Sequence, residues 1–339
     1  MNSVNHDQVG RQASATELTA SLVRTEYLQP GQSLPLVIQP QVRGINPITW
    51  AATHKEYIEA NLLNHGGLLF RNFGMKTAKE FDQFSRVICG ELLEYHERSS
   101  PRRQVSGNVY TSTDYPATES IFLHNENSYQ QTWPMRILFF CQTAPQSGGE
   151  TPIADCRKIY QRLNAELRQR FIDRKWMLIR NFGDGLGLSW QNVFQTTDKT
   201  QVEEHCRANG IQTEWKDNDR LRTRAVRPAV HYHPKTGEPV WFNHATFFHV
   251  STLDPVISAV LARQFKEADL PSTTCYGDGS SIEAKTLDEL REAYRSETVK
   301  FPWQEGDVLL LDNMLVAHGR TPYTGDRAIL VGMAQPYSG

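Results

Sequence analysis

The stretch LLLDNMLVAHGRTPYTGDRAILVGMAQ, residues 309–335, decides the fold of this 339-residue chain. It reads as an apolar strand, a short turn at Asp312 and Asn313, and a second apolar strand that opens at Arg327. An arginine inside a hydrophobic run costs solvation free energy unless it meets an anion, and its planar guanidinium suits a carboxylate. The stretch therefore predicts two buried strands, the second of which carries an anion-binding arginine.

His318 lies between these two strands, and a second pattern of metal-binding residue types occurs far upstream in IFLHNENSY, residues 121–129. His124 and Glu126 are two residues apart, so on an extended chain their side chains point to the same side. With His318 as a third ligand, two imidazoles and one carboxylate would occupy one face of an octahedral metal ion. The three open positions would suit a bidentate co-substrate and dioxygen.

The remaining chain mixes short strands with helices. From about residue 106 short apolar runs broken by Pro, Asn and Ser predict β-strands, whereas Arg157–Arg174 reads as one helix. Two T-x-x-E patterns, which begin at Thr53 and Thr77, predict capping boxes at helix N-termini. We expect a mainly β fold with flanking helices, whose core is a double-stranded β-helix (a cupin-like jelly roll).

Residues 1–28 are polar and poor in aromatic side chains, which predicts a flexible N-terminal tail. No second hydrophobic core is evident in the pattern after this tail. Residues 29–339 are therefore expected to form a single domain with helical insertions.

Charge and composition exclude several classes of partner. The 36 basic and 38 acidic residues give a net charge of −2, which argues against a nucleic-acid partner and against a cationic membrane-surface protein. There is no apolar run of membrane-spanning length and no secretory signal pattern at the N-terminus. Five scattered cysteines without a C-x-x-C pair indicate reduced thiols. We expect a cytoplasmic protein with a small-molecule substrate, and the sequence leaves its oligomeric state open.

The motifs together resemble one known family. The H-x-E at 124–126, the GGETPIAD segment at 148–155, the D-N-x₄-H-G-R ending of the first strand and the later G-D-R resemble the TauD/TfdA-like Fe(II)/2-oxoglutarate-dependent dioxygenases. The likeness is closer to the SyrP-like and clavaminate synthase-like members. It implies that His124, Glu126 and His318 bind Fe(II), that Arg327 holds the distal carboxylate of 2-oxoglutarate, and that Thr151 hydrogen-bonds the same co-substrate.

The resemblance also implies a reaction. An iron-oxo species held by the three ligands would remove a hydrogen atom from an unactivated C–H bond, with release of succinate and CO2. Hydroxylation is the expected outcome, and desaturation or cyclisation stays open. The natural-product members suggest an amino acid or derivative as substrate, either free or tethered to a carrier protein.

Two positions depart from relatives with other activities. Halogenating relatives replace the carboxylate ligand with a small residue, and Glu126 argues against halogenation. Members that use sulfonates carry a second arginine four residues after the co-substrate arginine, where this chain has Val331. Taurine is therefore not expected as the substrate.

Substrate contacts are expected from Asn127 and Tyr129, which adjoin the metal-binding segment, and from Asn243 and His244 in VWFNHATFFH. A strand asparagine satisfied by the backbone is an equal alternative for Asn243. Residues 184–225 and 270–285 are polar and contain glycine, which makes them candidate lid loops.

Two other functions remain open from the residues alone. Two histidines and a glutamate also bind Zn(II), as in hydrolases and isomerases. A non-catalytic β-sandwich could keep the fold and bind a small ligand. Arg327 with Thr151 argues against the zinc enzyme, because such an enzyme needs no co-substrate clamp, and the complete ligand set argues against the binding protein.

Overall fold

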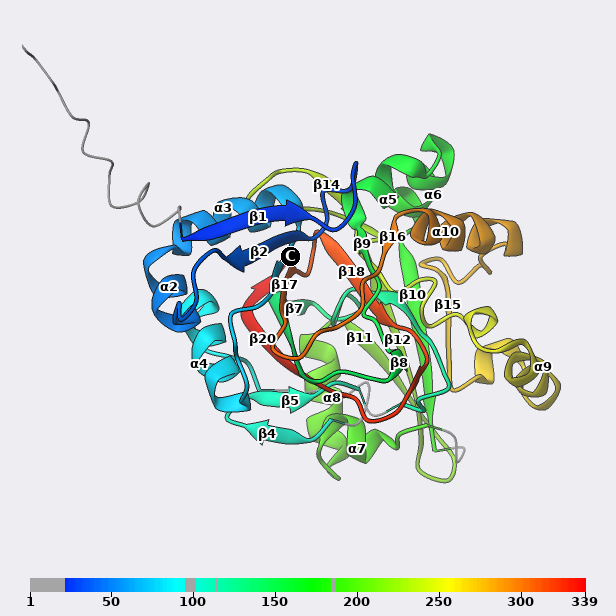
Figure 1. The fold of residues 1–339 in the computed structure, drawn as a ribbon. Helices are drawn as coiled ribbons and strands as arrows, with labels where there is room; N and C mark the ends of the chain where they lie inside the picture. Colours follow the sequence, from blue (N-terminus) through cyan, green and yellow to red (C-terminus); the bar gives the residue numbers. More distant parts are fainter. Residues whose placement is uncertain (1–21, 95–101, 114, 184–186) are drawn as a thin grey trace, which may run out of the picture.

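The computed structural model describes residues 22–94, 102–113, 115–183 and 187–339, and it is built around two facing β-sheets (Figure 1). The larger sheet has the strand order β1-β2-β3-β17-β7-β20-β5-β4. Its long central strands are mutually antiparallel, and only the pair β2 and β3 is parallel. Its strands are β1 (Val23–Tyr27), β2 (Leu36–Pro40), β3 (Gly67–Phe70), β4 (Gln104–Ser106), β5 (Val109–Thr111), β7 (Thr132–Thr143), β17 (Val308–Asp312) and β20 (Ala328–Ser338).

The smaller sheet has the order β16-β9-β18-β6, and the short pair β19-β8 continues along its edge. Its apolar side chains, among them Ile153 and Val316, share one core cluster with Ile137 and Leu311 of the larger sheet. The two sheets therefore enclose the core as a double-stranded β-helix does, which confirms the expected fold class. The strands are β6 (Ile121–His124), β8 (Ser147–Gly148), β9 (Ile153–Asp155), β16 (Thr298–Val299), β18 (Val316–Arg320) and β19 (Tyr323–Thr324).

The larger sheet is apolar on both faces because successive side chains on a strand point to opposite sides. On β7, Phe139 belongs to the core between the sheets, and Phe140 belongs to a second cluster on the outer face. On β17, Leu309 and Leu310 divide in the same way. Such uninterrupted apolar strands are expected only where both faces of a sheet are covered.

The outer face is covered by N-terminal helices, which lie on the blue and cyan side of Figure 1. Phe81 of α4 stacks on Phe140 with ring centroids 5.3 Å apart. The capping box of Thr77 with Glu80 at the start of α4 is confirmed. The helices are α2 (Pro47–Thr53), α3 (Lys55–His65) and α4 (Ala78–Cys89).

The capping box expected at Thr53 is wrong, because Thr53 is the last residue of α2 and its hydroxyl donates back to the carbonyl of Trp50. Asn46 caps that helix instead, followed by Pro47. Proline is preorganised for the first helical position, so the Asn-Pro pair is the stronger start signal.

A further four-stranded sheet, in the order β11-β12-β10-β15, lies beside the jelly roll with helices around it. The interpretation of residues 184–225 and 270–285 as lid loops is therefore wrong for most of their length, because their described parts contain strands and helices. Backbone hydrogen bonds and a small core around Trp190 and Leu221 order this region. The elements are α7 (Trp190–Phe194), α8 (Lys199–Ala208), β10 (Trp176–Phe182), β11 (Ile211–Lys216), β12 (Arg220–Arg227) and β15 (Ser272–Tyr276).

Two other expectations need correction. The tail predicted over residues 1–28 is too long, because Val23–Tyr27 pairs with β2 as an edge strand; residues 1–21 lie outside the described part. The helix predicted over 157–174 is divided at Leu163, where Asn164 caps a new helix. The remaining elements are α5 (Cys156–Arg162), α6 (Ala165–Arg174), β13 (Val230–Tyr232), β14 (Pro239–Trp241), η1 (Val250–Thr252), α9 (Pro255–Gln264), η2 (Glu267–Asp269) and α10 (Ala284–Ser296).

Candidate active site

Two neighbouring strands bring the predicted metal ligands together. β18 runs antiparallel to β6, and His318 is directly opposite His124 in the register. Their rings are 4.6 Å apart between centroids. Glu126 lies in the turn that follows β6, with Oε2 3.9 Å from Nε2 of His318. One ligand atom from each of the three residues lies within 4.8 Å of the others, which is close enough for one metal ion.

Asn313, in the turn between β17 and β18, fixes the backbone of Glu126. Its Oδ1 accepts a hydrogen bond of 2.8 Å from the amide of Glu126, and its Nδ2 donates to the carbonyls of Glu126 at 2.9 Å and Pro134 at 2.8 Å. Asn313 is fully buried, so these bonds are sheltered from water. The D-N pair of the sequence thus connects the two distant segments that carry the ligands.

The surroundings keep both imidazoles neutral. Burial lowers the pKa of His124, with the carboxylate of Glu126 acting in the opposite direction. Burial, and then the neighbouring His124, lowers the pKa of His318 well below its usual value. A neutral imidazole keeps the lone pair that a metal ion needs. Two neutral imidazoles and one carboxylate match the donor set of a non-haem Fe(II) centre, so the residues fit this metal.

Arg102 is a residue of this site that the sequence reasoning missed. Its Nη2 lies 3.0 Å from each carboxylate oxygen of Glu126, and its side chain is 6% exposed. The segment around it, SSPRRQ, carries no recognisable pattern, because its approach to residue 126 depends entirely on the tertiary fold.

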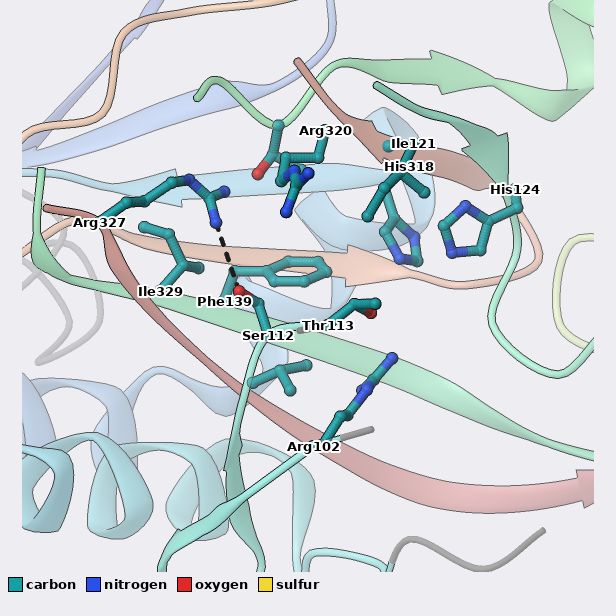
Figure 2. Close-up of a pocket in the computed structure, with 13 residues that line it drawn as sticks. Arg102, Ser112, Thr113, Ile121, His124, Phe139, His318, Arg320, Arg327 and Ile329 are labelled. Carbon is teal, nitrogen blue, oxygen red and sulfur yellow. Dashed lines mark hydrogen bonds between the residues drawn. The ribbon is translucent and has the colours of Figure 1, made fainter. Parts of the chain in front are cut away.

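A small cavity of about 40 Å³ opens beside the two histidines (Figure 2). Since a water molecule needs roughly 10–15 Å³ measured this way, the cavity has room for about three water-sized groups, the size of a carboxylate. Thr151 and Arg327 both line it, as the sequence predicted, and so do Ser112 and Arg320.

Arginine side chains make this cavity positive: Arg102, Arg320 and Arg327 all line it. Figure 2 shows Arg327 at the left, His318 at the right and Arg320 between them. Arg327 donates to the carbonyl of Gly149 at 3.0 Å and to the hydroxyl of Ser112 at 3.3 Å. Burial, and then the adjacent Arg320, lowers the pKa of Arg327 to about 10, so the group remains charged at neutral pH. An anion in the cavity would relieve both the desolvation and the repulsion.

A larger cavity of about 570 Å³ adjoins the other side of the ligand set. Asn127, Tyr129 and His244 line it, as predicted for substrate contacts. His244 stacks on Phe248 with centroids 4.9 Å apart, and Phe247 lies 4.6 Å from the ring of His124. The wall beside the ligands is therefore largely aromatic.

Asn243 does not fit the substrate role predicted for it. It is not among the described residues that line this cavity. Its Nδ2 donates to the carbonyl of Ala229 at 2.9 Å, and its Oδ1 accepts from the amide of Ala245 at 3.0 Å. The backbone alternative explains this asparagine, because a buried amide side chain must find partners wherever the chain supplies them.

Comparison with known proteins agrees with this geometry. The family model described as "Taurine catabolism dioxygenase TauD, TfdA family" matches residues 25–334. The chain belongs to the TauD/TfdA family of dioxygenases. It is therefore an oxidoreductase that uses Fe(II), 2-oxoglutarate and dioxygen. Among the described residues, no helix is both long and apolar enough to cross a membrane.

The relatives include proteins from biosynthetic pathways. The chain is 40% identical over 280 residues to the dapdiamide synthesis protein DdaC of Enterobacter agglomerans, with 82% of this chain and 85% of DdaC covered. It is 28% identical over 316 residues to a clavaminate synthase-like protein of Arabidopsis thaliana, with 90% and 89% covered. In fold it is similar to PvcB of Pseudomonas aeruginosa, with a TM-score of 0.57, 15% identity, and 98% and 94% covered.

Family membership decides between the functions that the residues alone left open. A dioxygenase requires both a metal site and a carboxylate-binding cavity beside it. The zinc hydrolase and the non-catalytic sandwich require only one of these features. The smaller cavity, which three arginines line, has no purpose in either alternative.

Proposed function

We propose that His124, Glu126 and His318 bind Fe(II), and that Arg327 and Thr151 bind the distal carboxylate of 2-oxoglutarate in the smaller cavity. The observation that carries this proposal is the location of the three ligand atoms, within 4.8 Å of one another and between two cavities of different size. The smaller cavity is cationic and has room for one carboxylate. The larger one has room for an organic substrate.

Each part of the chain then has a defined task. Bound Fe(II), with 2-oxoglutarate and dioxygen, supplies the oxidising power that breaks an unactivated C–H bond. The protein's residues orient the reactants: Arg327 holds the co-substrate by its far end, and Asn313 fixes the backbone of Glu126. The aromatic wall at Phe247 and Phe248 excludes water from the space beside the ligands, which limits stray oxidation.

The proposed substrate is an amino acid or an amino-acid derivative, either free or tethered to a carrier protein. The identity to a dapdiamide synthesis protein supports a role in natural-product biosynthesis. Val331, which is buried where sulfonate-using relatives have an arginine, supports a substrate other than taurine.

The proposed compartment is the cytoplasm. All five cysteines are buried free thiols, and burial raises the pKa of Cys89, Cys141 and Cys156 to about 12. Unreactive thiols of this kind suit a reducing compartment.

Hydroxylation is the proposed outcome, and one assay tests the whole proposal. Purified protein is incubated with Fe(II), 2-oxoglutarate and a panel of amino acids and their carrier-bound forms, and succinate is measured together with the product mass. We expect substrate-dependent succinate and a product that gains one oxygen atom. A product that loses two hydrogens would instead indicate desaturation or cyclisation. If no panel member stimulates succinate formation, the proposed substrate class is wrong.

A matched variant tests the metal ligands separately. The His318→Ala protein should lose both Fe(II) binding and succinate formation. A suitable control is His231→Ala, because His231 is a half-buried histidine that lies on β13 and lines neither cavity. Equal Fe(II) binding in both variants would contradict the proposed ligand set.

A further inference from the structure

Thr151 has a buried partner that neither its motif nor the proposed function explains. The indole Nε1 of Trp303 donates a hydrogen bond of 3.2 Å to Thr151 Oγ1. Both side chains are buried, with exposed fractions of 6% for Trp303 and 2% for Thr151. Trp303 belongs to the segment that precedes β17, so it reaches the cavity from outside the strand that carries Thr151.

The direction of this bond determines what the threonine can do. An indole N–H can only donate, so Thr151 Oγ1 must be the acceptor. Its own hydrogen is then left for another partner, and among the described residues no group accepts a hydrogen bond from this hydroxyl. Since Thr151 lines the smaller cavity, the remaining acceptor is whatever occupies that cavity.

The same reasoning applies to Ser112, which also lines the smaller cavity. Its hydroxyl oxygen accepts from Arg327 Nη1 at 3.3 Å, as the dashed line in Figure 2 shows. A guanidinium also can only donate, so the hydroxyl hydrogen of Ser112 is likewise left for the cavity. Ser112 and Thr151 both take part here as donors, together with Arg327 itself.

We propose that Trp303 is a positioning residue for the co-substrate: by occupying an acceptor site of Thr151, it turns the threonine hydroxyl into a donor to the distal carboxylate of 2-oxoglutarate. Arg327 donates to the hydroxyl oxygen of Ser112 in the same way, which makes Ser112 a further carboxylate-binding residue. This inference rests on the proposed role of Thr151. It explains how two neutral hydroxyls, each able to donate or accept, direct their hydrogens to an anion.

The test compares two ligands that differ only at the distal group. Binding of 2-oxoglutarate and of 2-oxopentanoate, which has a methyl group in place of the distal carboxylate, is measured by calorimetry on Mn(II)-loaded protein under nitrogen. Trp303→Phe keeps an aromatic ring and removes the N–H. We expect it to weaken 2-oxoglutarate binding by about 3- to 10-fold, in line with partial loss of a hydrogen bond to a charged group. Binding of 2-oxopentanoate should be unchanged.

A double-mutant comparison tests whether Trp303 acts through Thr151. Thr151→Val should weaken 2-oxoglutarate binding by about 10-fold or more. Adding Trp303→Phe to that variant should cause no further loss, because the hydroxyl is already absent. Trp190→Phe is the matched control, since its indole donates to the carbonyl of Asp219, far from the cavity, and its binding constants should equal those of the unmodified protein.

The possible failures are distinguishable. If the unmodified Mn(II)-loaded protein binds 2-oxoglutarate no more tightly than 2-oxopentanoate, the proposed co-substrate site itself is wrong. If it prefers 2-oxoglutarate but Trp303→Phe weakens both ligands equally, Trp303 contributes only packing and the inference is overturned. Unaltered 2-oxoglutarate binding in Trp303→Phe, or full additivity with Thr151→Val, would overturn it as well.

Discussion

Replacement of Asn313 by alanine should weaken metal binding although Asn313 is not itself one of the proposed ligands. The side chain makes three buried hydrogen bonds, two of them to the backbone of Glu126. Each such bond contributes a net ~1 kcal/mol, so the variant should lose about 3 kcal/mol of unfolding free energy in total. The two bonds on Glu126 account for about 2 kcal/mol of this loss. If this 2 kcal/mol is lost from the free energy of metal binding, because Glu126 is no longer held in place, the metal dissociation constant rises about 30-fold.

This magnitude agrees with the general effect of residues that support metal ligands, about 10- to 100-fold in affinity. The assay is a calorimetric titration of the metal-free protein with Mn(II), accompanied by thermal unfolding with and without the metal. The expected result is a weaker dissociation constant together with a smaller stabilisation of the protein by Mn(II).

Asn181→Ala provides the matched control. Asn181 also makes three side-chain hydrogen bonds, to the carbonyls of Ala268 and Leu270 and from Arg222, but it lies on β10 away from the ligands. Its replacement should lower stability by a similar amount and leave Mn(II) affinity unchanged. Mn(II) affinity that is normal in Asn313→Ala, or reduced equally in both variants, would refute the positioning argument.

Three further outcomes follow from the same geometry. Replacing Arg327 by glutamine should weaken 2-oxoglutarate binding to the Mn(II) protein by about 100-fold, because a buried charge-assisted pair is lost, and a loss below about threefold would count against the assignment. Ser112→Ala should cause a smaller loss, about threefold, measured by the same titration and absent with 2-oxopentanoate. Burial lowers the pKa of His124 and His318, so protons compete with the metal only at acidic pH. Mn(II) affinity should therefore stay constant as the pH falls through 6.5, and a decline that already begins there would contradict this account.

Helix starts show how far local sequence signals extend. The T-x-x-E pattern at Thr77 forms its capping box, and the same pattern at Thr53 does not. Both patterns satisfy the local rule equally well. The difference arises because Asn46 and Pro47 start a helix seven residues earlier and leave Thr53 at its end. A second helix, α3, does begin after Thr53, but His54 is at its N-cap position and makes no side-chain capping bond.

Substrate-side residues show the same limit. Asn127 and Asn243 are equally plausible contacts by residue type, yet only Asn127 lines the larger cavity. The side chain of Asn243 instead makes hydrogen bonds to the backbone of Ala229 and Ala245. Arg102 had no sequence signal at all, because its neighbours in the chain have no part in the site.

The sequence by itself was enough to propose the residues of the site. The H-x-E pair, His318 and Arg327 were recognisable because metal and carboxylate binding demand particular side chains, and the resemblance to the TauD/TfdA family added Thr151. The short apolar runs broken by Pro, Asn and Ser likewise predicted the mainly β core.

Only the tertiary structure decided how these residues act together. The pairing of β18 with β6 brings His318 opposite His124, Asn313 fixes the backbone of Glu126 in a different turn, and Trp303 donates to the hydroxyl oxygen of Thr151. Each of these effects joins segments that are far apart in the chain. Hydrogen-bond direction and strand register depend on positions in space, and no local pattern in the sequence encodes them.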